Sequence, residues 1–268
     1  MRRLSVLMVA IASMLAALVL VAPAARADPV SEAQAYVILK TGQHVNVLKT
    51  DCSPLTVKNG KNVCFLSNYL GAMLIGNVNK RKEAAVREEY DTLVTLAGWH
   101  VSVAEVGSQF IVPLPCSTSE VNFTCQGFVE QRLTGAEVYW AGYQQELVEA
   151  PKIGECVADN PTYLARVRRA YASIQVVDKN NTLASLVAGK PESWRDAQSW
   201  RDALWDDVAS YGQAFASHDR AVIDLQGFVA ANGRMHVFDP AGLNPDKKFY
   251  TCWSAAMLAL AHIIQAEH

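Results

Sequence analysis

The stretch "PESWRDAQSWRDALWDDV", residues 191–208, repeats the pentapeptide SWRDA and contains three tryptophans. At about 100° per residue, the apolar side chains from Trp194 to Phe215 fall on one side of a helix and most carboxylates fall on the other. The six-residue offset between the two copies rotates a helix by about 240°, so they do not form equivalent sites. The pattern therefore predicts an amphipathic helix whose aromatic side chains face the core.

Arg201 interrupts the apolar side of this predicted helix. It could lie on the indole of Trp205 in a cation–π contact, or pair with a carboxylate of a neighbouring helix. A third interpretation makes Arg201, Trp194 and Trp205 a ligand-binding set. The sequence leaves these alternatives open, and core packing accounts for the tryptophans without a ligand.

Helical patterns extend over much of the remaining chain. Asn79 and Gly98 bracket one helix as its cap and its end, and Asn160-Pro161 is a typical helix start. The final segment, "CWSAAMLALAHIIQ", is apolar on every side and predicts a wholly buried helix. The predicted helices cover residues 79–98, 128–149, 161 onward, 191–217, 219–231 and 252–265.

Two stretches predict antiparallel hairpins instead. "LTVKNGKNVCFL", residues 55–66, has Asn59-Gly60 at its centre, which suits a two-residue turn. "HVSVAEVGSQFIVPLP", residues 100–115, alternates in polarity and has Gly107 for its turn. The predicted fold class is α+β and mainly α-helical: a disulfide-stabilised helical core with one or two small hairpins. Residues 28–126 would hold the hairpins and two local disulfides, and residues 127–268 a helical region continuous with them.

The N-terminal segment has the features of a secretory signal peptide. Arg2 and Arg3 precede an apolar run, and Ala25-Arg26-Ala27 offers a cleavage site. Cleavage after Ala27 leaves 21 basic and 26 acidic residues, a formal net charge of −5. The signal peptide predicts a periplasmic or secreted protein. The net negative charge disfavours a nucleic-acid partner, so we expect that the protein binds no nucleic acid. An uncleaved membrane anchor is the alternative.

All six cysteines follow the signal peptide, and an even number in an exported chain indicates a disulfide framework. Their spacing predicts two local bridges and one long-range bridge. The long-range bridge would stabilise the fold by roughly 4–5 kcal/mol. No CxxC pair or histidine spacing suggests zinc, so no metal site is predicted. The predicted pairs are Cys52–Cys64, Cys116–Cys125 and Cys156–Cys252.

One arrangement has the residue types of a catalytic set. Cys252-Trp253 begins an apolar helix, where the backbone dipole would stabilise a thiolate. This step resembles the nucleophile helix of papain-like cysteine peptidases. The resemblance implies Cys252 as nucleophile, with His236 and Asp239 as base and orienting group in a permuted His-Asp-Cys order. The competing interpretation makes Cys252 half of the long-range disulfide.

No other motif predicts an enzyme, since GxSxG, glycine-rich phosphate loops and HExxH are absent from the sequence. The leading expectation is therefore an exported non-catalytic binding protein without a cofactor, such as an accessory, inhibitor or immunity factor with a protein partner. The alternatives are the papain-like hydrolase and an envelope component that docks on a membrane complex.

We predict that the exported protein begins at Asp28, because Ala25 and Ala27 are the small residues that a signal peptidase accepts. Intact-mass measurement of the protein from the periplasm or medium tests this. A mass that includes Met1 would contradict it.

Overall fold

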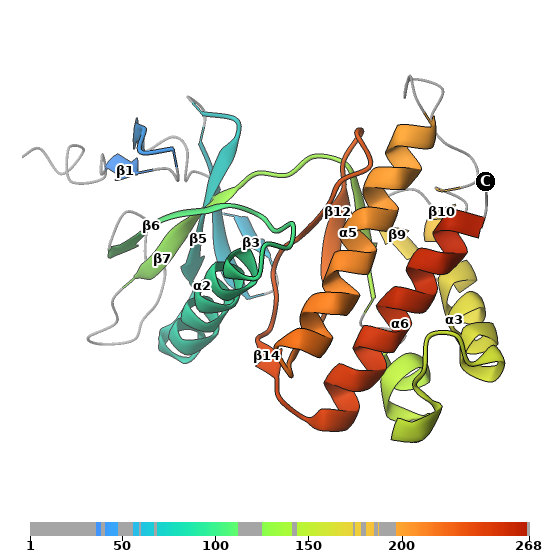
Figure 1. Cartoon of the computed structure of the whole chain (residues 1–268). Helices are drawn as coiled ribbons and strands as arrows, with labels where there is room; N and C mark the ends of the chain where they lie inside the picture. The colour runs from blue at the N-terminus through green and yellow to red at the C-terminus, as the bar shows by residue number, and fades with distance from the viewer. Residues whose placement is uncertain are drawn as a thin grey trace, which may run out of the picture.

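The computed structural model describes residues 36–38, 41–47, 56–58, 60–66, 69–111, 125–140, 144–173, 175–177, 181–184, 187 and 197–266. These residues form two halves, each built on a five-stranded antiparallel sheet. Figure 1 shows the N-terminal half on the left, with one helix against its sheet, and the C-terminal half on the right, with several helices. A single main core cluster contains buried residues from both halves.

The N-terminal sheet has the strand order β3-β4-β5-β7-β6. Its strands are β3 (Thr56–Lys58), β4 (Lys61–Phe65), β5 (Ala72–Asn77), β6 (Val106–Ile111) and β7 (Gln126–Gln131). Val63, Ile75 and Phe128 contribute one face to the main core, while Cys64 and Leu74 belong to a smaller cluster. A short hairpin, β1 (Tyr36–Ile38) and β2 (His44–Asn46), accompanies this sheet.

Helix α2 (Glu83–Gly98) follows the short 3₁₀ turn η2 (Lys80–Lys82) and packs against β5 and β7. The Asn79 side chain accepts a hydrogen bond from the Lys82 amide at 3.2 Å, so it caps the turn that leads into the helix. The buried side of α2 consists of Val86, Glu89, Thr92, Leu93 and Leu96. Glu89 is thus an acid in an otherwise mostly apolar stripe.

The C-terminal sheet has the order β10-β9-β8-β12-β13. Its strands are β8 (Ala136–Tyr139), β9 (Gln175–Val177), β10 (Asn181–Thr182), β12 (Gln226–Val229) and β13 (Met235–Val237). A separate two-stranded pair joins β11 (Ala221–Val222) to β14 (Leu243–Asn244). The helices are η4 (Gln145–Glu149, one π-helical stretch), η5 (Ile153–Glu155), α3 (Pro161–Ser173), α5 (Ala197–Ser217) and α6 (Lys247–Ala266).

Two helices form the centre of the C-terminal half. Helices α5 and α6 pack along each other, as Figure 1 shows in orange and red. Trp200 of α5 and Trp253 of α6 are almost fully buried, so the aromatic side of α5 faces the core as predicted. Helix α6 is long and apolar enough to cross a membrane, but 67 % of its most apolar stretch is buried in the molecule.

The two halves are tied together beside β13. The Ala104 amide donates to the Val237 carbonyl oxygen at 2.7 Å, and the Val237 amide donates to the Ser102 carbonyl oxygen at 3.2 Å. Tyr211 of α5 also donates its hydroxyl hydrogen to the Ser102 carbonyl oxygen. The segment after α2 therefore pairs with the C-terminal sheet, and it fixes α2 relative to β13.

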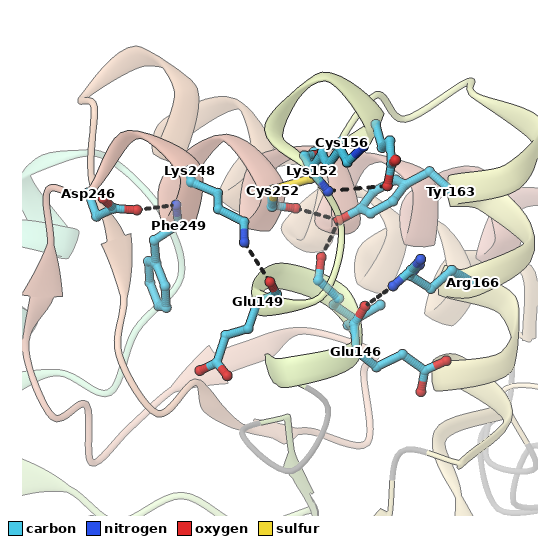
Figure 2. The surroundings of a disulfide bond; sticks show 12 residues. Glu146, Glu149, Lys152, Cys156, Tyr163, Arg166, Asp246, Lys248, Phe249 and Cys252 are labelled. Atoms are coloured by element: carbon cyan, nitrogen blue, oxygen red, sulfur yellow. Dashed lines mark hydrogen bonds between the residues drawn. A yellow bond between two sulfur atoms is a disulfide. The ribbon is translucent and has the colours of Figure 1, made fainter.

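Cys156 and Cys252 form a disulfide that closes 96 positions of sequence (Figure 2). The Tyr163 hydroxyl lies beside it, 2.7 Å from the Leu147 carbonyl oxygen and 2.8 Å from that of Cys252. The predicted long-range bridge is therefore present, and it clamps the region between η5 and α3 onto α6.

Cys64 and Cys125 are also disulfide-bonded. The remaining two cysteines, Cys52 and Cys116, lie outside the described residues, as do the signal peptide and the cleavage site after Ala27.

The predicted fold class is wrong. The chain is not a helical core with one or two small hairpins, since two five-stranded antiparallel sheets organise it and helices pack against them. The error has a physical cause: the strands are mostly three to six residues long. Short strands contain too few residues for alternation to be distinguished from a helical pattern.

Three predicted segments show this error. Residues 128–149 form parts of β7, β8 and η4, and residues 219–231 contain β11 and β12 where helices were predicted. Gly107 does not turn a hairpin, because it lies within β6 next to a register shift in the pairing with β7. The hairpin at residues 55–66 is confirmed, with Lys58 opposite Lys61 and Gly60 at a φ of 75°.

We predict that the Cys156→Ser/Cys252→Ser double variant loses about 4–5 kcal/mol of unfolding free energy, because cleaving a 96-position loop frees the unfolded chain. Urea unfolding of both proteins without reductant measures this. Reductant alone is not a substitute, since Cys64 and Cys125 are disulfide-bonded too. A loss below 1 kcal/mol would contradict the prediction.

Candidate functional site

A cleft of about 290 Å³ lies between the two sheets. This volume is near the lower end of the usual range for small-molecule sites, about 300–1,000 Å³. The cleft is lined from the N-terminal half by strands β4 and β5, helix α2 and the end of β7, and from the C-terminal half by β8, β12 and the residues after β13. The lining residues are Lys61, Val63, Phe65, Met73, Ile75, Glu89, Glu130, Gln131, Arg132, Leu133, Glu137, Phe228, Phe238 and Asp239.

The cleft changes character along β4. Phe65 and Met73 are cross-strand partners, and Val63 and Ile75 form the next pair on the same face. Lys61 follows at the other end of the strand, about 13 Å from Phe65 at the rise of an extended chain. The N-terminal wall is therefore apolar over two residue pairs and charged at one end.

The opposite wall is aromatic. Phe228 of β12 and Phe238 after β13 contact each other with ring centroids 4.6 Å apart. At the mouth, the Arg132 guanidinium lies 4.6 Å from the centre of the Phe65 ring. A flat, apolar ligand group fits between such walls, since aromatic rings stack on planar partners.

At the charged end, Lys61 binds two carboxylates. Its Nζ lies 2.5 Å from Glu89 Oε2 on α2 and also forms an ion pair with Asp239 Oδ1, which follows β13. The side chains of Lys61, Glu89 and Asp239 are 13 %, 2 % and 19 % exposed. One ammonium therefore joins a strand, a helix and the opposite half of the molecule.

Burial and charge act against each other in this triad. Burial opposes the Lys61 ammonium, but Glu89 and Asp239 outweigh that effect and raise the pKa of Lys61, so it stays charged. Burial raises the pKa of Glu89 to about 7, although Lys61 acts in the opposite direction. Two carboxylates around one ammonium leave an excess negative charge when both are ionised.

A further carboxylate, Asp224, lies between β11 and β12. It accepts a hydrogen bond from Gln226 Nε2 at 3.2 Å. Burial, followed by the hydrogen bond to Asp224, raises the pKa of the Tyr139 phenol, and Asp239 adds to the effect. Asp224 and Asp239 thus both act on one phenol.

Both aspartates adopt an uncommon backbone conformation, with φ of 59° at Asp224 and 48° at Asp239. Aspartate tolerates this left-handed region better than most residues, and such conformations concentrate at functional sites. The two residues flank the β12–β13 hairpin, whose turn contains Gly233 at a φ of 83°. The paired strands β11 and β14 hold the outer ends of the same segment.

A magnesium ion with a phosphate needs few carboxylates from the protein. Among the described residues, no group of three or more His, Cys, Asp or Glu side chains is arranged to hold a metal ion. Mg²⁺ seldom needs one, because it commonly binds one or two carboxylates and takes its other ligands from substrate phosphates and water. Asp239, which lines the cleft, is the residue that would supply such a carboxylate.

The structure does not assemble the predicted Cys252–His236–Asp239 set. Cys252 is fully buried and bound to Cys156, so it has no thiol. His236 Nδ1 lies 3.1 Å from Ser102 Oγ, and burial lowers the pKa of its imidazole. Asp239 pairs with Lys61 and lines the cleft, so it belongs to the candidate site. It does not orient a catalytic histidine there.

The second predicted set, Arg201, Trp194 and Trp205, is only partly within the described residues. Trp205 is half-buried beside the main core, and Trp194 lies outside the described residues. The half-buried Arg201 has no hydrogen-bond partner for its Nε in the described part of the chain. Neither Arg201 nor Trp205 lines the cleft.

Sequence reasoning missed Lys61, Glu89 and Asp224, although two signals were present. Glu89 is at helical spacing between Val86 and Leu93, on the apolar side of its helix. The stretch "DLQGFVAANGRMHVFD", residues 224–239, has Asn-Gly between two short apolar runs and an aspartate at each end. That is a hairpin signal, not a helix end.

A larger hollow, about 540 Å³, lies between α2 and strands β6 and β7. Its charged side chains largely neutralise one another: Arg87 pairs with Glu83 at 3.3 Å, and Gln126 Nε2 donates to Glu83 at 2.8 Å. The smaller cleft is the better candidate because it combines unbalanced charge, aromatic walls and two unusual backbone positions.

No protein-family model matches the chain, and no curated protein matches it.

We predict that Glu89 makes the fold less stable as the pH rises. Its pKa is raised from 4.5 to about 7 in the folded state, so the folded state binds the extra proton between these values. The proton on Glu89 contributes unfolding free energy on the order of 2–3 kcal/mol. This contribution is fully present below about pH 4.5 and is lost as the pH rises past 7. Urea unfolding at pH 5 and pH 8 measures the loss.

Glu89→Gln is the matched control, because it keeps the shape of the side chain and cannot titrate. The unfolding free energy of the parent relative to this variant should fall between pH 5 and pH 8. Equal pH dependence in the two proteins would show that Glu89 does not take up a proton.

Proposed function

We propose that the cleft binds a magnesium nucleoside triphosphate and transfers its terminal phosphoryl group to a hydroxyl, in the manner of protein kinases. One observation carries the proposal: Lys61 is ion-paired with Glu89 of the helix beside the sheet and faces Asp239 from the other half. In protein kinases, a strand lysine paired with a helix glutamate and a metal-binding aspartate of the opposite lobe must come together for activity.

Each group of residues at the cleft has its own role in the proposed reaction. The aromatic and aliphatic walls hold the base, and Lys61 neutralises the phosphates while Glu89 fixes its position. Asp239 would hold the magnesium ion. A magnesium ion held there would supply positive charge to neutralise the phosphates. Asp224 takes the position of the catalytic-loop aspartate, which accepts the proton of the attacking hydroxyl.

The chain departs from the kinase pattern at several positions. The kinase lysine is on the third strand of its sheet, whereas Lys61 is on the second, β4, directly opposite Asn77 of β5. The chain just before Lys61 contains one glycine, Gly60, whereas kinases have a glycine-rich loop that covers the phosphates. Val229 occupies the place of the asparagine, five residues after the aspartate, that holds the second magnesium ion.

These departures support a second candidate, a cleft that binds the nucleotide without transferring phosphate. Val229 is buried and apolar, so it provides no metal ligand. A binding protein of this kind agrees with the expectation, from the sequence, of an exported non-catalytic interaction protein. We propose a periplasmic or secreted location for either activity, because disulfides such as Cys156–Cys252 persist in oxidising compartments.

We predict that the disulfide-bonded protein binds ATP with MgCl₂ at one site, and that Lys61→Met and Asp239→Asn each weaken binding at least tenfold. The reason is the loss of a charge-assisted contact, worth about 1.5–3 kcal/mol. Isothermal titration calorimetry measures the affinities, and circular dichroism establishes that each variant is folded. Asp239→Asn preserves side-chain shape if Lys61→Met proves unstable.

Lys247→Met serves as the control, since Lys247 is an exposed lysine at the start of α6. The absence of ATP binding by the parent protein would refute both candidates. Release of ADP separates the two candidates. A transferase releases ADP, at a rate that falls by about 10²–10⁴-fold in Asp224→Asn. A binding protein binds ATP and releases no ADP.

A further inference from the structure

The end of the cleft farthest from Lys61 is built by one row of residues across the N-terminal sheet. Phe65 of β4 pairs with Met73 of β5, and Met73 pairs with Glu130 of β7, so these three residues lie side by side. All three line the cleft. Lys61 is about 13 Å from Phe65 along β4. Glu130 therefore lies with the apolar part of the wall, at the end opposite the charged triad.

Glu130 places an acid in the cleft at a position that solvent hardly reaches. The residue is 2 % exposed, although it lines the cleft. Its cross-strand neighbours on both sides of β7 are apolar: Met73 on β5 and Val106 on β6. An ionised carboxylate accepts hydrogen bonds and donates none. A ligand group that contacts Glu130 from the cleft must therefore offer donors.

Arg132 provides the opposite charge at the same end of the cleft. Its amide donates to the Gly71 carbonyl oxygen at 2.9 Å, so the sheet pairing continues past the end of β7. Residues two apart on an extended chain share a face, and Glu130 and Arg132 both line the cleft. The Arg132 guanidinium lies over Phe65, a member of the same row as Glu130. One acceptor and one donor thus flank the aromatic end of the cleft.

A carboxylate and a guanidinium together complement the polar edge of guanine. Guanine has two neighbouring donors, its ring N1–H and its 2-amino group, and it has acceptors at O6 and N7. A carboxylate accepts from the two donors, and arginine donates to the acceptors. Adenine carries an amino group in place of O6 and has an acceptor at N1. It would therefore present a donor to the guanidinium and an acceptor to the carboxylate.

We propose that Glu130 and Arg132 are specificity-determining residues that make the cleft select a guanine nucleotide. This inference rests on the proposed function, because it concerns the base of the same nucleotide. The base stacks between Phe65 of one wall and Phe228 of the other, and the phosphates extend toward Lys61. Glu130 accepts hydrogen bonds from N1–H and the 2-amino group, and Arg132 donates to O6.

The test measures the affinities of GTP, ITP and ATP, each with MgCl₂, for the disulfide-bonded full-length protein. We expect GTP to bind about 10- to 100-fold more tightly than ATP, the usual effect of a hydrogen bond to a charged group. ITP lacks only the 2-amino group of GTP, so its affinity should be intermediate. Equal affinities for GTP and ATP, or a preference for ATP, would overturn the inference.

Two variants test the two side chains separately. Glu130→Gln keeps the shape of the side chain, but its amide offers a donor and an acceptor together, which suits adenine. The ratio of GTP affinity to ATP affinity should therefore fall at least tenfold. Arg132→Met keeps an apolar stem beside Phe65 and should lower the ratio in the same direction. Each ratio is measured on one protein, so partial unfolding of a variant does not change it.

Glu137→Gln is the matched control. Glu137 also lines the cleft, but it belongs to the opposite wall and is half-buried. The substitution changes the charge of the cleft as Glu130→Gln does, and it should leave the ratio of GTP affinity to ATP affinity unchanged. A ratio that falls in Glu137→Gln and stays constant in Glu130→Gln would overturn the inference.

The response of both nucleotides to Lys61→Met separates the two possible failures. If GTP and ATP bind equally well and Lys61→Met weakens both, this inference is overturned and the proposed function stands. If neither nucleotide binds to the parent protein, the proposed function fails and the inference fails with it.

Discussion

The contact of Lys61 with Glu89 and Asp239 is the interaction on which the cleft depends. It connects strand β4, helix α2 and the end of the β12–β13 hairpin, and so brings both halves of the molecule to one point. Buried charges seldom stabilise a fold more than apolar side chains of similar size would. Three ionisable side chains in this position, one of them 2 % exposed, therefore indicate a role beyond stability.

The rest of the structure supplies the stability and the frame for this contact. The apolar core continues from the N-terminal sheet through α5 and α6, and the Cys156–Cys252 disulfide clamps α6 from the side. Neither α6 nor η5 lines the cleft. The main chain between α2 and β6 pairs with Val237, so the helix that carries Glu89 is fixed to the strand that precedes Asp239. Rigid elements thus position the charged groups, as a preorganised site requires.

Asp224 and Asp239 show how a short hairpin can build a site. Each lies at one end of the β12–β13 hairpin with a positive φ, which turns the chain sharply and presents the carboxylate at the edge of the sheet. In the proposed function, Asp239 holds the magnesium ion, Lys61 neutralises the phosphates and Asp224 accepts the proton. Val229, in the same hairpin, is buried and apolar and offers no metal ligand.

The sequence by itself determined the local features of this protein. The aromatic side of α5, the Asn160 cap of α3, the turn at Gly60 and the buried α6 all follow from residues close together in the chain. The pairing of the short strands did not follow, because a strand of two to six residues gains its stability from a distant partner and carries little pattern of its own. The candidate site, like the strand pairing, depends on contacts between residues that are distant in the sequence. Lys61 lies 28 positions from Glu89 and 178 from Asp239, and only the packing of the two sheets makes these three residues neighbours.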